Sequence, residues 1–243
     1  MPVYVDKAKQ RIKSKVNKIR SLCNSGKNTN MLEADTRAIV QSVLTDLLGW
    51  EMILDVTQET EINRDYCDYM IHLKGKPYMV IEVKPVSKSL KENHLKQARH
   101  YAQDKGIDWV ILTNGDEWQV YRLYYKKHAG ANPEPELFFL YSTSFTDTEG
   151  IKSKQRVEDL YLLSKEASKH NELEAFYQQL SALSPQELTK RILQKDVLDR
   201  IRIGIKNDIN YRIDNEELAQ RIISIISDEA IPTNPKYWIN KSK

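Results

Sequence analysis

The sequence predicts an α/β chain in two parts. Residues 1–150 should combine helices with strands, and residues 151–243 should form a helical extension. Two observations predict this division. Short apolar or alternating segments bounded by turn residues recur up to about residue 142, whereas only helical periodicity follows residue 150. The hairpin-like stretch 65–85 gives the first part its centre.

Composition narrows the class of protein. Hydrophobic residues make up 40% of the 243 residues, which is enough for a sizeable core, and a net charge of +3 argues against an overall polycation. The two cysteines form neither a disulfide framework nor a zinc cluster. The basic N-terminus lacks the apolar segment of a signal peptide, and no apolar run approaches a membrane span. We therefore expect a cytoplasmic protein that does not contact the membrane.

The first predicted helix spans residues 6–23 and is basic and amphipathic. Apolar residues from Val5 to Cys23 fall at helical spacing, and seven lysines and arginines lie between Lys7 and Arg20. Two interpretations stay open. The cations form a solvated face of a packing helix, or they contact phosphate groups.

The clearest predicted helix spans residues 31–48. Asn30 is the expected N-cap, with Glu33 as the return half of a capping box. Gly49 is placed to end the helix in the left-handed conformation. Glu33 also lies one turn before Arg37, a spacing that suits an ion pair.

The elements that follow alternate between strands and helices. We expect a helix at 90–105, and a Gly115-Asp116 turn between two strands. The predicted strands are 52–62, 66–73, 77–84, 108–114, 117–125 and 137–142. The predicted helices of the extension are 153–168, 170–182, 185–203 and 215–229. The extension carries no recognisable catalytic pattern, so we expect it to cover the sheet, or to form an oligomer or partner surface.

The hairpin 65–85 brings two acids together. If its turn is centred on Gly75, Asp68 and Glu82 are directly opposed, with Cβ atoms about 4.5–5.5 Å apart. A two-residue turn would offset the pair by one. If both carboxylates were buried at that separation, their mutual repulsion would force one of them to bind a proton. A bound Mg²⁺, or Mn²⁺ in its place, would offset the repulsion between the carboxylates, and such ions prefer oxygen ligands.

A lysine completes the pattern. Strand alternation places Lys84 on the same face as Glu82. Its charge can orient an attacking water, help lower the pKa of that water, or stabilise charge on a reacting phosphate. The sequence thus predicts a metal-dependent nuclease site. The alternative is an ordinary cross-strand salt-bridge set on a solvated face, which the apolar run 78–83 disfavours.

These residues resemble the PD-(D/E)xK nuclease superfamily, and in particular the N-terminal nuclease domain of type I restriction enzyme R subunits. The matching segments are E-A-D-T-R (33–37), L-L-G-W (47–50), D-Y-C-D-Y (65–69), G-K-P-x-x-V-I-E-V-K-P (75–85), Q-A-R-H-Y-A (97–102) and W-V-I-L-T-N-G-x-x-W-x-V-Y-R-L (109–123). The resemblance implies a restriction-endonuclease-like fold, a mixed central sheet flanked by helices in the order α-β-β-β-α-β.

The resemblance also implies roles for individual residues. Asp68, Glu82 and Glu33 would be metal ligands together with the carbonyl of Val83, and Lys84 would be the catalytic lysine. Gln97 would join the catalytic set, and with Tyr101 it matches a Q-x-x-x-Y element that faces DNA. Simpler interpretations remain: Glu33 as a capping acid, and Gln97 and Tyr101 as helix surface and core edge.

The sequence departs from the family at two points. Cys67 stands where the literal "PD" pattern has proline, and no G-x-x-x-x-G-K-[ST] motor loop is present. We expect a stand-alone nuclease, a fragment, or a module of another assembly that acts on DNA. Candidate partners are a second copy of the chain or a motor or regulatory subunit supplied in trans. A non-catalytic nucleic-acid-binding or assembly module is the alternative function.

Overall fold

A computed structural model describes residues 2–62, 65–125 and 135–226, with the side chains of 59–62, 65 and 66 left aside. The chain forms two compact units, Met1–Glu174 and Ala175–Lys243. Each unit is described by itself. No helix in the described ranges is long and apolar enough to cross a membrane.

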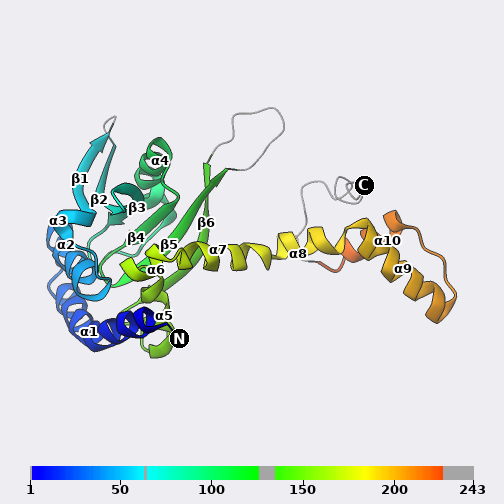
Figure 1. The fold of residues 1–243 in the computed structure, drawn as a ribbon, viewed down its shortest axis with the longest axis horizontal. Helices are drawn as coiled ribbons and strands as arrows, with labels where there is room; N and C mark the ends of the chain where they lie inside the picture. The colour runs from blue at the N-terminus through cyan, green and yellow to red at the C-terminus, as the bar shows by residue number, and fades with distance from the viewer. Residues whose placement is uncertain (1, 63–64, 126–134, 227–243) are drawn as a thin grey trace. The chain divides into compact units, whose positions relative to one another are not determined.

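The first unit is built on a six-stranded sheet with the strand order β1-β2-β3-β4-β5-β6 (Figure 1). Neighbouring strands are antiparallel except β3 and β4, which are parallel and joined through α4 (Leu95–Lys105). The predicted α/β class with a mixed sheet and C-terminal helices is confirmed. The strands are β1 (Val56–Ile62), β2 (Asp65–Leu73), β3 (Lys76–Val83), β4 (Trp109–Thr113), β5 (Glu117–Tyr125) and β6 (Pro135–Ser144).

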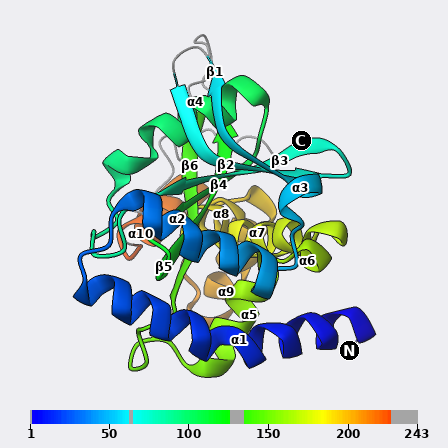
Figure 2. The ribbon, with the colours of Figure 1, turned by 90° about the vertical axis from the view of Figure 1, so that its left-hand side faces the viewer.

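Helices cover the sheet. Helix α4 packs on β2, β3 and β4 over a cluster of buried residues that includes Val80, Tyr101 and Val110. On the other side lie α2 (Glu33–Ser42), α5 (Ser153–Leu162) and α6 (Lys165–Lys169), with α1 (Val3–Asn28) packed against them (Figure 2). Strand β4 is buried throughout and β3 is buried from Met79 to Val83, which explains the continuous apolar sequences of these segments.

Helix α1 uses its cations to bind other elements of the first unit. Lys9 pairs with Glu158, and Arg11 donates to both carboxylate oxygens of Glu166 at 2.6 and 2.8 Å. Lys15 and Lys18 pair with Asp46, while Arg20 donates to the carbonyl of Phe145 at 2.7 Å. The apolar stripe of the helix is buried from Val5 to Cys23. This geometry favours the packing interpretation of the basic helix.

The hairpin has a two-residue turn and a compensating irregularity. Lys74 and Gly75 adopt positive φ angles of 54° and 75°, and Leu73 pairs with Lys76. That turn alone would offset Asp68 from Glu82 by one residue. A register shift between Ile71 and His72 restores the alignment, so that Tyr69 pairs with Ile81, one step from the two acids.

Several predicted boundaries are wrong for local reasons. Asn30 is not the N-cap of α2; Leu32 is, and Asn30 has a positive φ of 50°. The segment 52–62 begins with a helical turn, α3 (Met52–Asp55), before β1. The predicted helix 31–48 becomes α2 followed by a π-helical segment, Val43–Leu47, and Gly49 ends it at a φ of 76° as expected.

Two predicted helices of the extension are split. The segment 153–168 divides into α5 and α6, because the Ser164 side chain accepts a hydrogen bond from the Ala167 amide and starts a new helix. The segment 185–203 divides into α8 (Pro185–Ile192) and α9 (Lys195–Ile209). Ser184 caps α8 as predicted, with its hydroxyl accepting from the Glu187 amide. Helices α5 and α6 belong to the first unit.

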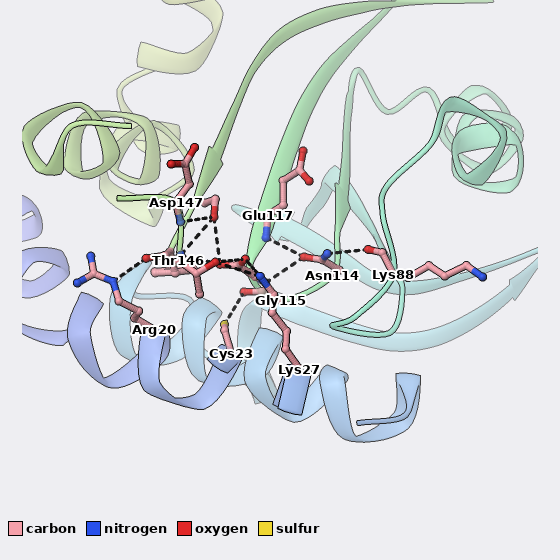
Figure 3. Close-up of polar contacts among 12 residues, drawn as sticks. Arg20, Cys23, Lys27, Lys88, Asn114, Gly115, Glu117, Thr146 and Asp147 are labelled. Atoms are coloured by element: carbon pink, nitrogen blue, oxygen red, sulfur yellow. Dashed lines mark hydrogen bonds and ion pairs between the residues drawn. The ribbon is translucent and has the colours of Figure 1, made fainter. Parts of the chain in front are cut away.

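A buried acid network ties three elements of the first unit together. The Asp116 carboxylate, in the turn between β4 and β5, accepts hydrogen bonds from Lys27 at 2.5 Å and from the Thr146 hydroxyl at 2.6 Å. Figure 3 shows Lys27 on α1 and Thr146 after β6 meeting at this turn. These hydrogen bonds and the ion pair compensate for the burial of the carboxylate, whose residue is 3% exposed.

The second unit is helical. Helix α7 (Glu172–Ala182) begins in the first unit and ends in the second, followed by α8, α9 and α10 (Asn215–Ile223). The second unit has a buried core cluster that comprises Leu193, Leu198, Leu218 and Ala219. Asp214 caps α10 by accepting from the Glu217 amide at 2.8 Å.

Candidate active site

A pocket of about 260 Å³ opens beside the ends of β2 and β3 and brings together most of the predicted site residues. It lies in the first unit. The lining residues are Glu33, Arg37, Cys67, Asp68, Glu82, Lys84 and Gln97.

The two strands diverge at the pocket because a side chain replaces the backbone as hydrogen-bond partner. The pairing of β2 with β3 runs as far as Tyr69 and Ile81. At the next step the Asp68 carboxylate accepts a 2.7 Å hydrogen bond from the Val83 amide. Simple alternation predicts Cys67 on the face opposite Asp68, but both residues line the pocket, and Cys67 is buried in the core cluster under α4.

Glu82 and Lys84 form a tight pair. The Lys84 ammonium lies 2.6 Å from Glu82 Oε1 and 3.9 Å from Glu33 Oε2. The Lys84 amide donates to the Thr113 carbonyl at 2.8 Å, which extends the β3–β4 pairing and fixes the backbone that carries the lysine. The Glu82 side chain is 6% exposed and that of Lys84 is 19% exposed, so water screens this pair weakly.

Burial dominates the electrostatics of the acids. Desolvation raises the pKa of Glu82 to about 7 despite the opposing effect of Lys84. Desolvation also raises the pKa of Asp68, against the hydrogen bond from Val83 and the charge of Arg37. Burial alone would lower the pKa of Lys84, but its hydrogen bond to Glu82 and the nearby acids outweigh that effect and raise it. The pocket thus holds carboxylates whose ionised forms lack full compensation.

Helix α2 brings Glu33 and Arg37 to the pocket through two tethers. The Tyr69 hydroxyl donates to the Arg37 carbonyl at 2.9 Å, and the Val86 amide donates to the Thr36 hydroxyl at 3.1 Å. These bonds join the first turns of α2 to β2 and to the loop after β3. The Arg37 guanidinium lies 3.5 Å from Asp68 Oδ1.

The two predicted residues of α4 differ in environment. Gln97 is exposed and lines the pocket. Tyr101 is 1% exposed and donates to the Met70 sulfur at 3.7 Å, within the cluster under the helix. The position of Tyr101 favours the core-edge interpretation, while Gln97 remains a candidate for contact with a ligand.

The donor set suits a hard divalent cation held partly by water. Within the described part of the chain, no three His, Cys, Asp or Glu side chains form a group that could hold a metal ion. Glu33, Asp68 and Glu82 therefore line the pocket without forming a three-carboxylate cage. Mg²⁺ commonly binds through one or two carboxylates and keeps several waters. Asp68 and Glu82 fit that pattern, and a cation would offset their burial, whereas Val83, whose carbonyl is the predicted third ligand, is not among the residues that line the pocket.

The loop that follows Lys84 carries two exposed lysines. It carries Lys88 and Lys91 between β3 and α4, and Asn114 anchors it by donating to the Lys88 carbonyl at 2.8 Å (Figure 3). Burial, followed by the charges of Lys84, Lys88 and Lys91, lowers the pKa of His94. These lysines therefore lie close enough to His94 to oppose its protonation.

A second, larger groove of about 540 Å³ lies beyond this loop. It is lined by Lys27, Lys88, Asn114, Asp116 and several hydroxyl groups. Asp116 and Lys27 already satisfy each other there, and the pKa of Asp116 is lowered because its hydrogen bonds outweigh desolvation. The uncompensated acids lie in the smaller pocket, so we assign the chemistry to that one.

Comparison with known families identifies part of the chain. Residues 39–134 match the type I restriction enzyme R protein N terminus. The resemblance predicted from the motifs is confirmed over this range, which includes Asp68, Glu82, Lys84 and Gln97. Glu33 and Arg37 precede it. Comparison with curated proteins and with solved structures gives no match.

Sequence reasoning did not assign Arg37 to the site. The available signal was its spacing, because it lies one turn after Glu33 and therefore on the same helix face. That spacing predicts an ion pair with Glu33. The contact with Asp68 depends on how α2 docks against β2, which no local pattern encodes.

Proposed function

We propose that this protein is a Mg²⁺-dependent endonuclease that hydrolyses DNA phosphodiester bonds in restriction, defence or repair. The observation that carries the proposal is the pocket in which buried Asp68 and Glu82 lie beside Lys84. The match of residues 39–134 to a restriction enzyme domain supports the same chemistry. The same match supports a cytoplasmic location.

Asp68, Glu82 and the Val83 carbonyl would hold the cation, with Glu33 at the rim. When bound, Mg²⁺ supplies Lewis acidity toward a phosphoryl oxygen and lowers the pKa of a coordinated water. The raised pKa values of the two acids mean that a proton competes with the cation for them.

Lys84 acts on the reacting groups. Its ammonium lies 2.6 Å from Glu82, and the backbone hydrogen bond to Thr113 fixes the main chain that carries it. From that position it orients the attacking water and stabilises negative charge on the phosphate in the transition state. Gln97 at the edge of the pocket orients the substrate.

The decisive experiment is a cleavage assay on plasmid and oligonucleotide DNA with a Mg²⁺ titration. The wild-type protein should nick or cut DNA only with Mg²⁺ or Mn²⁺. Lys84→Ala should reduce the rate by roughly 10²-fold or more, as expected for the loss of a group that stabilises charge in the transition state. Asp68→Ala and Glu82→Ala should abolish cleavage, because each removes a carboxylate from the cation.

Lys105→Ala, at the exposed end of α4, is the matched control and should cleave at the wild-type rate. Full activity in all three site variants would remove this assignment of the site. Calorimetry that finds DNA binding but no binding of divalent ions would instead favour a non-catalytic nucleic-acid-binding module. A wild-type protein that binds the ion but cleaves only with an added subunit would identify a motor or regulatory partner in trans.

A further inference from the structure

Arg37 is a pocket residue without a role in the chemistry described above. Its backbone carbonyl accepts from the Tyr69 hydroxyl at 2.9 Å, and the adjacent Thr36 is bonded to the Val86 amide. The start of its side chain is therefore fixed relative to β2 and to the loop after β3. The side chain is 27% exposed, and Arg37 is among the residues that line the pocket.

The contact between Arg37 and Asp68 is loose. The two charged groups are 3.5 Å apart, whereas a hydrogen bond between an ammonium or guanidinium and a carboxylate is usually about 2.7–2.9 Å long. By contrast, Lys84 lies 2.6 Å from Glu82. The pairing of Arg37 with Asp68 therefore opposes the approach of another anionic oxygen less than a tight pair would.

The charges of the pocket require such a group if a phosphate is to enter. Glu33, Asp68 and Glu82 contribute three negative charges when ionised, and Arg37 and Lys84 contribute two positive ones. The pocket alone would repel a phosphodiester. A divalent cation on the acids reverses the balance, so that a phosphate is attracted to the pocket that Arg37 lines.

We propose that Arg37 binds a nonbridging oxygen of the scissile phosphodiester and is a substrate-binding residue of this pocket. The inference rests on the proposed nuclease function and names the group that receives the substrate. A guanidinium suits the task because its planar fork matches two phosphate oxygens and it stays charged at every accessible pH. The small size of the pocket, about 260 Å³, keeps any phosphate near the acids within reach of Arg37.

The competing role for Arg37 is to neutralise Asp68 only. The two roles predict opposite changes in DNA binding. If Arg37 only neutralises Asp68, its removal leaves the acid freer for the cation, so binding of DNA with the cation stays constant or tightens. If it binds phosphate, its removal weakens DNA binding and eliminates one phosphate contact from the salt dependence.

The test measures binding of a short duplex with Ca²⁺ in place of Mg²⁺, at several salt concentrations, by fluorescence anisotropy. Arg37→Ala should weaken binding by roughly tenfold to a hundredfold, the range for a lost hydrogen bond to a charged group. The slope of log K against log salt should fall in magnitude by about 0.9, the value for one phosphate contact. Arg37→Lys should keep the slope but bind more weakly than wild type, because a lysine cannot bind two oxygens in one plane.

Arg11→Ala is the matched control, since Arg11 is 28% exposed and pairs with Glu166 but does not line the pocket. It should leave affinity and slope unchanged. Wild-type affinity and slope in Arg37→Ala would overturn the inference while leaving the nuclease function intact. Failure of the wild type both to bind DNA with Ca²⁺ and to cleave it with Mg²⁺ would overturn both. If Arg37→Ala does not fold, the DNA affinity of Arg37→Lys is the test. A wild-type affinity in that variant would overturn phosphate binding by Arg37.

Discussion

Single residues of the proposed site were predictable where local sequence determines orientation. Glu82 and Lys84 share a face because a strand has a period of two, whereas the alignment of Asp68 with Glu82 depends on the register shift in β2. Asp116 shows that local sequence does not identify the partners of a residue. The sequence identified it only as part of a turn, whereas its partner Lys27 lies 89 residues away on α1. Partners this distant in the chain are set by tertiary packing.

The burial of Asp116 leads to a prediction about stability. Asp116→Asn should lower the free energy of unfolding by about 1–3 kcal/mol at pH 7, because it weakens hydrogen bonds made by a buried charge. The folded protein lowers the pKa of this acid, so its contribution is fully present above the unfolded value and is lost as pH falls through the folded value.

Urea unfolding of wild type and Asp116→Asn at a series of pH values measures this difference. The gap should stay constant near neutrality and close in acid, below a pH of about 4, the ordinary pKa of an aspartate. Asp104→Asn, an exposed acid on α4, is the control and should change stability by less than about 0.5 kcal/mol. A gap that widens in acid would contradict the assigned sign.

At the scale of elements, the sequence predicted where strands and helices lie better than where they end. The hairpin, α4 and the strands after it were found because apolar periodicity and turn residues agree. The split between α5 and α6 was missed because Ser164 begins a helix inside an otherwise continuous helical pattern. The register shift in β2 has no sequence signal that we recognise, yet it aligns Asp68 with Glu82.

The docking of α2 supplies a prediction at this scale. Thr36 is fully buried, and its hydroxyl accepts from the Val86 amide and donates to the Leu32 carbonyl at 2.9 Å. Thr36→Val keeps the shape but leaves the buried amide without this acceptor, so it should destabilise the protein by about 1–3 kcal/mol. Thr36→Ser keeps the hydroxyl and should lose about 1 kcal/mol or less for the missing methyl group.

Urea unfolding again gives the free energies, and hydrogen exchange of the Val86 amide reports the tether directly. Exchange should accelerate in Thr36→Val and stay slow in Thr36→Ser. Equal protection of this amide in both variants would show that the hydroxyl does not hold α2 to the loop after β3.

At the scale of the whole molecule, the sequence marks a change of character near residue 150, whereas the compact units divide at 174. Periodicity identifies helices but not what they pack against, and α5 and α6 pack onto the first unit. The start of α7 is tied to it as well. Leu173 is fully buried, and Glu172 accepts from Tyr161 at 2.6 Å and from Tyr4 at 3.2 Å.

This anchoring predicts that a chain ending at Leu183 folds and works without the rest of the second unit. All pocket residues lie between Glu33 and Gln97, and the truncated chain keeps α7 whole. It should show one cooperative thermal transition and cleave DNA with Mg²⁺ at the rate of the full chain. The full chain should show a further transition at lower temperature, because the second unit buries only a small core cluster within the described residues. Calorimetry of both chains measures the number of thermal transitions and their cooperativity. A truncated chain that melts without cooperativity would show that the second unit is required to fold the first.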